Sequence, residues 1–470
     1  MFKKGYTPLL LFILISSFFN TACEDYVDIG APDHKMVTET VFADGETASA
    51  AVQGIYNEMA TADFSRGYLY SVTALAGMSP DIFETTSATD TRYGPFQQNE
   101  ISPIGSDDAT ANYNLWSSAY NIIYMANSVL EGTNSSKTIS KETRDRVGGQ
   151  ALFIRAFTYF YLVNLYGELP LLLSTDYRKN AIAEREDVDT VYDRIAEDLD
   201  SAIILLEGEE EYRDSERTNV NRFAAMALRA RVYLYQQDWE KAEELAGEVI
   251  AQTSLYGILD DLDQVFLKNS REAIWQISPV GRGLTATYTG EGYLYRGQNS
   301  SQIKLSGDFV ASMSPNDKRL LHWMAFNTGR EFYFPQKYKD SNSRNAVVEY
   351  STVLRLPEQY LIRAEARAMQ GRLSEAIKDI DVVRSRAGLG LLADMDPDVD
   401  GAELLEELMD QRKKELFAEW GHRWLDLKRT GRATEVLGPI KPQWQDTDVL
   451  FPIPGEEREK NPNLSQNNGY

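Results

Sequence analysis

Apolar residues recur every three or four positions along most of the chain, which is the spacing that buries one face of an α-helix. This pattern predicts helices over residues 47–60, 111–130, 142–166, 191–206, 220–250, 357–386 and 402–429. Glycine and proline fall at most of the breaks between these segments. Strand-like alternation is sparse and is clearest in AIWQI, residues 273–277. The chain is therefore predicted to be a mainly α protein.

Two of these segments, residues 220–250 and 357–386, carry small and medium-sized residues at the same spacing. Ala230, Leu234, Ala242 and Ala246 in the first segment are matched, 134 residues later, by Ala364, Ala368, Ala376 and Ile380. Small residues at these places let two antiparallel helices approach closely, with the turn marked by Asp238 or Gly371. Each segment resembles a tetratricopeptide helix pair, and residues 154–166 could open a third. Because the pairs are scattered rather than evenly repeated, they are expected to form a scaffold that supports long loops.

The N-terminal segment has the pattern of an export signal. Lys3 and Lys4 precede an uncharged, mostly apolar run at residues 8–19, which is shorter than the roughly 20 residues that a helix needs to cross a bilayer. Two small residues then precede Cys23, the only cysteine of the chain. The pattern resembles a bacterial lipoprotein signal, which implies removal of residues 1–22 and lipidation of Cys23. The alternative is an ordinary secretion signal beside an incidental cysteine.

Charge and composition exclude several classes of function. Removal of residues 1–22 takes away two lysines and no acids, so the net charge changes from −23 to −25. A surface this acidic repels phosphate backbones, and no nucleic-acid partner is expected. The three histidines, His34, His322 and His422, lie far apart in sequence, which disfavours hydrolases with metal or Ser-His chemistry. No cofactor or metal is expected.

Nine sequence blocks, in the right order, connect the chain to one family. They are CEDYVDIGAP, VFADGETASAAVQGIYNEMA, LWSSAYNIIYMANSVL, ALFIRAFTYFYLVNLYGELPLLL, TNVNRFAAMALRARVYLY, EAIWQI, VLRLPEQYLIRAEARA, QRKKELFAEWGHRWLDLKRTG and LFPIPGEEREKNPNLSQNNGY. With them the chain resembles the SusD/RagB-like nutrient-binding lipoproteins of Bacteroidetes-type outer membranes. The resemblance implies a tetratricopeptide-like helix-pair scaffold with long loop insertions and few short strands. It also implies an N-terminal region, 23–225, and a C-terminal region, 226–470, within one compact unit.

The resemblance carries an expectation of function. It implies an outer-membrane lipoprotein, anchored at Cys23 and facing the cell exterior, that binds an oligosaccharide and delivers it to a SusC-like TonB-dependent transporter. Such a protein is not an enzyme. Three alternatives stay open: an oligopeptide-binding member of the same family, a surface glycosidase, and a tetratricopeptide scaffold that binds only proteins. A glycosidase would need two carboxylates about 5–9.5 Å apart across a cleft.

Two segments are candidates for the ligand surface, because the resemblance implies that an early and a middle insertion assemble it. The middle segment, residues 281–302, has five glycines, and its candidate contacts are Tyr288, Tyr293, Tyr295, Arg296 and Asn299. The early segment, residues 68–100, is expected to be non-helical and supplies Asp81, Arg92, Tyr93 and Phe96. Aromatic planes can stack on the apolar faces of sugar rings, while amide and guanidinium groups satisfy the hydroxyls.

The glycine-spaced tyrosines, Tyr293 and Tyr295, are interpreted as poorly placed for core packing. Their removal is therefore expected to weaken ligand binding while leaving stability almost unchanged. The alternative is a long loop with its aromatic side chains tucked beneath it, in which case the same removal would destabilise the protein.

Two further motifs are interpreted as structural. In EWGHRWLDLKR, residues 419–429, Glu419 with Arg423 and His422 with Asp426 have the four-residue spacing of intrahelical pairs. Trp420 and Trp424 share that spacing and are expected to face the core, so a catalytic role for Glu419 is not favoured. DPDVDG, residues 396–401, is expected to be a solvated turn rather than a calcium site.

Overall fold

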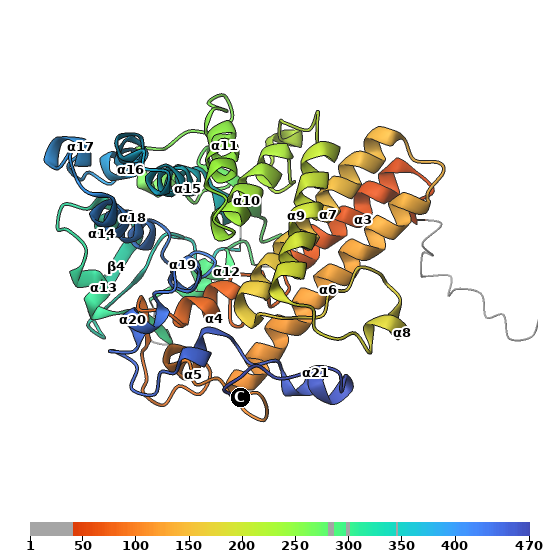
Figure 1. Cartoon of the computed structure of the whole chain (residues 1–470), viewed down its shortest axis with the longest axis horizontal. Helices are drawn as coiled ribbons and strands as arrows, with labels where there is room; N and C mark the ends of the chain where they lie inside the picture. The colour runs from red at the N-terminus through yellow and green to blue at the C-terminus, as the bar shows by residue number, and fades with distance from the viewer. Residues whose placement is uncertain (1–40, 281–285, 298–300, 345) are drawn as a thin grey trace, which may run out of the picture.

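The computed structural model describes residues 41–280, 286–297, 301–344 and 346–470, and it is mainly α-helical (Figure 1). The long helices are α3 (Gly45–Met59), α6 (Asp107–Ser135), α7 (Lys141–Tyr166), α9 (Val188–Leu205), α10 (Arg222–Tyr235), α11 (Trp239–Ile250), α15 (Leu356–Met369), α16 (Leu373–Arg386) and α18 (Gly401–Glu415). This confirms the predicted fold class.

Shorter elements connect the long helices. They are α4 (Val72–Met78), α5 (Gly94–Gln98), α8 (Tyr177–Asn180), α12 (Gly290–Leu294), α13 (Gly307–Ala311), α14 (Lys318–Trp323), α17 (Leu392–Met395), α19 (His422–Arg429), α20 (Ala433–Leu437) and α21 (Gly455–Lys460), with the 3-10 turns η3 (Arg213–Ser215), η4 (Leu262–Gln264) and η5 (Asp446–Val449). The short strands of the described ranges pair as β1–β3, β2–β6 and β4–β5, all antiparallel, and they are β1 (Phe83–Thr85), β2 (Ala273–Ile277), β3 (Ile303–Leu305), β4 (Met324–Asn327), β5 (Phe332–Pro335) and β6 (Ser351–Arg355).

Helices α3, α6, α7 and α9 form a bundle, at the right of Figure 1. Side-chain caps define where its members begin: Ser106 accepts from a backbone N–H of α6, Ser140 from α7 and Asp187 from α9. From Val147 onward α7 is buried almost all round, because the other three helices surround it. The apolar core that starts in this bundle continues through the molecule to Leu464, near the C-terminus.

The two tetratricopeptide-like helix pairs, α10–α11 and α15–α16, are present and stack on each other. Ala230, Ala242 and Ala246 of the first pair share one apolar cluster with Ile362 and Ala366 of α15, so the small residues do allow close approach. The predicted turns are tight: backbone φ is 59° at Gln237 and 76° at Gly371. Residues 154–166, which are expected to be able to open a third pair, form the second half of α7, and α7 packs against the later helix α9.

The prediction of one helix over residues 402–429 is wrong, because the chain turns sharply between α18 and α19. Ala418, Trp420 and Gly421 all have positive φ, at 59°, 43° and 69°. A Cβ on Gly421 would lie 2.7 Å from the Cβ of Ala76 in α4, so only glycine fits at this contact. The turn carries Glu419 into the interior.

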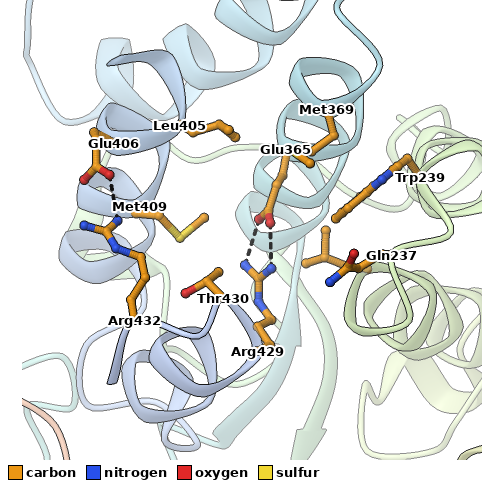
Figure 2. A pocket seen from close by; sticks show the side chains of 11 residues that line it. Gln237, Trp239, Glu365, Met369, Leu405, Glu406, Met409, Arg429, Thr430 and Arg432 are labelled. Atoms are coloured by element: carbon orange, nitrogen blue, oxygen red, sulfur yellow. Dashed lines mark hydrogen bonds and ion pairs between the residues drawn. The ribbon is translucent and has the colours of Figure 1, made fainter. Parts of the chain in front are cut away.

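Where the helix pairs meet α18 and α19, they enclose a cavity of about 310 Å³, here called the helical cavity (Figure 2). Its lining residues come from the α10–α11 turn, α15, α18 and the end of α19, and they are Leu234, Gln237, Trp239, Glu365, Met369, Leu405, Glu406, Met409, Arg429, Thr430 and Arg432.

Candidate functional site

The two candidate segments, which are about 200 residues apart in sequence, are joined side by side. Strand β1 pairs with β3, so Phe83 lies opposite Leu305. The pairing continues where Thr86 donates its backbone N–H to the carbonyl of Gln302 at 2.8 Å. The expectation that the early segment is non-helical is wrong, because it contains α4 and α5. The middle segment, interpreted as irregular, contains the short helix α12.

Two glycines of the middle segment allow α12 to lie directly on neighbouring backbone. A Cβ on Gly290 would come within 1.8 Å of the carbonyl oxygen of Arg66, and one on Gly292 within 2.3 Å of that of Asp340. No other residue fits at either place. These glycines therefore serve close packing, and they bring the tyrosines of α12 next to residues 66–70.

Three partly exposed tyrosines form a cluster at this junction: Tyr68, Tyr288 and Tyr293, here called the tyrosine cluster. The rings of Tyr68 and Tyr293 meet edge to face at 4.8 Å between centroids. Tyr288 stacks on Tyr293 at 5.4 Å, with 16° between the ring planes. Aromatic pairs with this geometry hold each other in position.

Arg296 completes the cluster, because its guanidinium carbon lies 3.8 Å from the ring centroid of Tyr293. At that separation the guanidinium covers one ring face, which leaves the opposite face for stacked Tyr288. Hydrogen bonding from Arg296 also lowers the pKa of Tyr293, whereas burial raises the pKa of Tyr68. Tyr293 is thus held from both faces, and it positions Tyr288.

The early segment and Gln302 line a cavity of about 330 Å³, here called the polar cavity, whose lining residues are Thr86, Ser87, Thr89, Asp90, Thr91, Arg92, Asp107 and Gln302. Arg92 connects it to the aromatic surface, since its guanidinium carbon lies 5.5 Å from the ring centroid of partly exposed Tyr70. Asp90 is held by the backbone N–H groups of Arg92, at 3.0 Å, and Tyr93, at 2.6 Å. Hydroxyl, carboxylate, guanidinium and amide groups together can both donate to and accept from the hydroxyls of a sugar.

Three of the predicted contact residues are core residues, so their assignment to the ligand surface is wrong. Phe96 is fully buried and packs edge to face on Phe451 at 5.3 Å, and Tyr93 is 1% exposed. Tyr295 is 4% exposed and stacks on Phe83 at 5.3 Å. Rings enclosed in this way present no face to a ligand. The expectation that Tyr295 is poorly placed for core packing is wrong for the same reason.

Three further predicted residues are Asp81, Asn299 and Cys23. Asp81 lines a separate cavity of about 260 Å³ and is paired with Arg423 at 2.9 Å and Lys413 at 2.8 Å. Burial opposes ionisation of Asp81, but these two cations hold its pKa well below the ordinary value. Asn299 and Cys23 lie outside the described residues.

Sequence reasoning missed Tyr68 and Tyr70, although a signal for them exists. Both candidate segments contain the tripeptide Tyr-Leu-Tyr, at residues 68–70 and 293–295. Three of its four tyrosines remain partly exposed, and only Tyr295 is in the core. The polar cavity had no sequence signal, because it forms only when β3 places Gln302 against the early segment.

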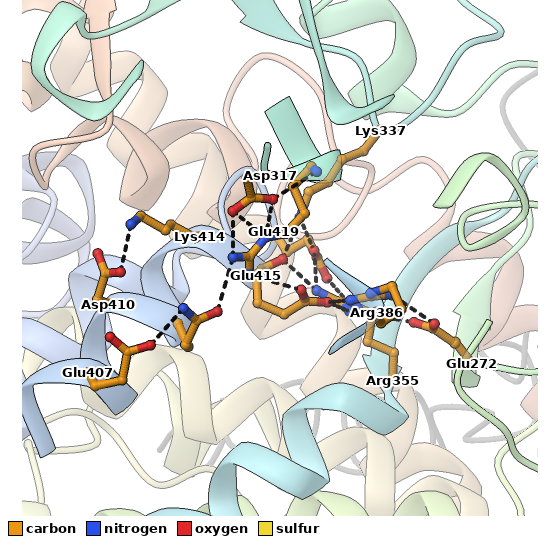
Figure 3. Close-up of polar contacts among 12 residues, drawn as sticks. Glu272, Asp317, Lys337, Arg355, Arg386, Glu407, Asp410, Lys414, Glu415 and Glu419 are labelled. Carbon is orange, nitrogen blue, oxygen red and sulfur yellow. Dashed lines mark hydrogen bonds and ion pairs between the residues drawn. The ribbon is translucent and has the colours of Figure 1, made fainter. Parts of the chain in front are cut away.

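A cluster of buried ionisable groups lies elsewhere and is structural (Figure 3). This buried charge network contains four acids and four bases, none of which is more than 6% exposed: Glu272, Asp317, Arg319, Lys337, Arg355, Arg386, Glu415 and Glu419. Arg355 is its hub, with ion pairs of 2.5 Å to Glu415 and 2.7 Å to Glu419. Every acid here faces a base, so the network offers no carboxylate for glycoside hydrolysis.

The intrahelical pairs predicted within residues 419–429 do not form. Glu419 pairs with Arg355 and Lys337, and those cations lower its pKa although burial opposes this. Asp426 accepts instead from Arg412 and Arg429, both at 2.8 Å, rather than pairing with His422. The sharp turn before α19 is the physical reason for the first pair, because it places Glu419 outside any helix. In the second pair, both residues lie in α19, but the two oxygens of Asp426 accept from the two arginines.

The two tryptophans of residues 419–429 lie in the core, as expected, and DPDVDG, residues 396–401, contains the expected turn. Trp420 and Trp424 are at most 1% exposed. In the second motif, Asp400 accepts from the backbone N–H groups of Ala402 and Glu403 and so begins α18. Within the described ranges, no three His, Cys, Asp or Glu side chains are grouped as metal ligands.

No helix in the described part of the chain is long and apolar enough to span a bilayer.

Comparisons with known proteins agree on one family. Residues 94–234 match a family model described as starch-binding and associating with the outer membrane, and residues 284–470 match the SusD family model. A curated relative, SusD-like protein P25 of Formosa agariphila, is 25% identical, with 98% of each chain covered.

Solved structures share the fold. A SusD superfamily protein from Bacteroides vulgatus superposes with a TM-score of 0.76 at 18% identity, over 92% of this chain and all of that one. Surface glycan-binding protein A from Bacteroides thetaiotaomicron, in complex with laminarihexaose, superposes with a TM-score of 0.75 at 19% identity, over 90% of this chain and all of that one.

Proposed function

Because the chain belongs to the SusD/RagB family, we propose that it is a surface-exposed, oligosaccharide-binding lipoprotein of the outer membrane. It captures glycan outside the cell and delivers it to a SusC-like TonB-dependent transporter. The observation that supports binding is the junction of the two insertions, which forms both a partly exposed tyrosine cluster and a polar cavity.

The two parts of this junction have different tasks. Tyr68 and Tyr288 supply aromatic surface for the apolar C–H faces of sugar rings, with Tyr293 and Arg296 holding Tyr288 in place. The polar cavity satisfies hydroxyl groups, and Arg92 supplies a cation to its lining. A site that combines an apolar platform with a few fixed polar groups is the usual form of a small-ligand site.

Affinity electrophoresis against neutral polysaccharides tests the proposal. The panel includes laminarin, since a protein with the same fold was solved with laminarihexaose. We expect at least one polysaccharide to retard the unmodified protein, and Arg92→Ala to reduce that retardation. Migration that is unchanged by every polysaccharide would contradict glycan binding, and binding of oligopeptides instead would favour the oligopeptide alternative. Release of reducing sugar by the pure protein would show a glycosidase.

The anchor is tested separately, with Cys23→Ala. Several acyl chains, each contributing about 0.8 kcal/mol per buried methylene, would attach the mature chain firmly to a membrane. We expect the variant to remain folded but to leave the outer-membrane fraction. A variant that stays bound after a high-salt wash, which screens electrostatic attachment, would show that lipidation of Cys23 is not the anchor.

Delivery requires a complex with the transporter. We expect the affinity-tagged lipoprotein, extracted from outer membranes in mild detergent, to copurify with a TonB-dependent barrel. If a variant that no longer binds glycan still copurified with the barrel, glycan binding and transporter binding would be independent of each other. Absence of any such barrel would contradict delivery.

A further inference from the structure

The helical cavity shares no lining residue with the polar cavity or the tyrosine cluster. One wall of it is Trp239, the first residue of α11, whose backbone position is set by the Asp238 cap. Leu234, which is 1% exposed, and Met409, which is 8% exposed, add apolar surface to its lining. Trp239 itself is partly exposed, so the cavity offers a large aromatic side chain to a ligand.

The charged groups of the cavity are already paired with each other. Glu365 and Arg429 form a bidentate pair at 2.6 and 2.7 Å, with both side chains nearly buried. Glu406 and Arg432 form a second pair at 2.9 Å near the mouth. Figure 2 shows Trp239 beside the first pair and Met409 between the two. Two acids and two bases leave no net charge in the cavity, so it is complementary to a neutral ligand.

The buried pair still has hydrogen-bonding capacity. Each Nη of Arg429 carries a second N–H, and each oxygen of Glu365 has a further lone pair. Arg429 is also fixed by Asp426, which accepts from its Nε at 2.8 Å. Rigid donors and acceptors side by side suit a hydroxyl group, which both donates and accepts.

From these observations we propose that the helical cavity is a second carbohydrate site, in which a neutral sugar ring stacks on Trp239 while its hydroxyls bind the Glu365–Arg429 pair. The volume of about 310 Å³ is at the lower end of the range for small-ligand sites, about 300–1,000 Å³, and matches a short saccharide. This site goes beyond the proposed function, since it does not require the tyrosine cluster.

The test follows Trp239 directly by fluorine NMR. The full chain is labelled with 5-fluorotryptophan, and the Trp239 signal is assigned from the spectrum of Trp239→Phe. Maltose, cellobiose, laminaribiose and mannobiose are then titrated to about 50 mM each. This concentration would nearly saturate even a weak site with a Kd of about 10 mM. We expect at least one sugar to move the Trp239 signal in a saturable way. Partly exposed Trp444, which is outside this cavity, is the internal control for non-specific effects.

A matched pair of variants makes the result specific. Leu405→Lys places a charge in the cavity and should raise the apparent Kd at least tenfold, whereas Leu321→Lys, at a side chain that is 69% exposed elsewhere, should leave it unchanged. No saturable shift with any of the four sugars would overturn the proposal, as would a shift that Leu405→Lys leaves intact. If the cavity instead bound an apolar side chain of a partner protein, none of the four sugars would give a saturable shift.

Failure here is distinguishable from failure of the proposed function. Tyr288→Ala, which tests the tyrosine cluster, should leave the Trp239 shift unchanged. If that variant abolished the shift, the helical cavity would not be an independent site and the proposal would be overturned.

Discussion

The tyrosine cluster and the buried charge network contain residues that suggest chemistry, and they differ in what their side chains can reach. In the network, Arg355, Glu415 and Glu419 are at most 6% exposed and bind each other. In the cluster, Tyr68 and Tyr288 are partly exposed and are held by other rings. Groups whose bonding capacity is used up inside the protein contribute to stability, whereas groups that are oriented yet accessible can contribute to binding. Residue type alone does not separate the two cases.

The largest effect that this comparison predicts is at the hub of the network. Arg355→Met should lower the free energy of unfolding by about 3–5 kcal/mol, because it removes the cation that Glu415 and Glu419 share while both acids stay buried. Urea unfolding followed by circular dichroism measures this. Lys141→Met is the control, since Lys141 is 87% exposed in its pair with Asp145 and should contribute at most about 1 kcal/mol. Similar losses for the two variants would contradict the stabilising role of the buried charge network.

The next prediction divides the tyrosines of the middle segment. Tyr295→Ala should cost about 3 kcal/mol or more, because it empties the space occupied by a ring that is 4% exposed and stacked on Phe83. Tyr124→Ala removes a tyrosine that is 51% exposed and is the matched control. Thermal melts of both variants measure the difference. A melting temperature of Tyr295→Ala equal to that of the control would place this ring outside the core.

The third prediction concerns pH. Burial lowers the pKa of His422 to about 4, although Glu358 partly opposes the shift. Its folded-state pKa therefore lies below the unfolded value of about 6.5, so protonation favours unfolding. The associated stability is fully present above about pH 6.5 and is lost as the pH falls towards 4, by up to roughly 3 kcal/mol.

Urea unfolding at several pH values between 4 and 7 checks this. The slope of stability against pH should be shallower for His422→Gln than for the unmodified protein. His322→Gln, at a side chain that is 38% exposed, is the control and should keep the full slope. An unchanged slope in His422→Gln would show that the carboxylates alone cause the loss at acidic pH.

Most of the scaffold could be predicted from sequence, because a helix that packs on one face must repeat its apolar residues at helical spacing. The same logic located the turns at Asp238 and Gly371 and the core positions of Trp420 and Trp424. It failed at the turn before α19, because that turn depends on contact between Gly421 and Ala76, which are 345 positions apart in sequence. Local periodicity carries no information about such a contact.

The candidate site could be predicted only by region. Residues 68–100 and the described part of 281–302 do lie together, yet Tyr93, Phe96 and Tyr295 point into the core while Tyr68 and Tyr70 are partly exposed. Tyr293 and Tyr295 are two residues apart at the end of one short helix and have opposite environments. What separates them is the partner each ring meets, Tyr288 or Phe83, and these partners are brought in by α12 docking and by the β1–β3 pairing.

The smallest predicted effect in free energy is the most informative about function. Tyr288→Ala should weaken binding of the polysaccharide that retards the unmodified protein in electrophoresis. The expected loss is about tenfold, which corresponds to about 1.4 kcal/mol. The melting temperature should change little, because the ring is partly exposed and lies in the cluster rather than in the core. Calorimetric titration and a thermal melt on the same variant measure both quantities. Tyr177→Ala, at a tyrosine that is 70% exposed on α8, controls for loss of an exposed ring and should bind normally. Equal affinities of the two variants would contradict a stacking role for Tyr288, and the polar cavity around Arg92 would then have to bind the ligand without an aromatic platform.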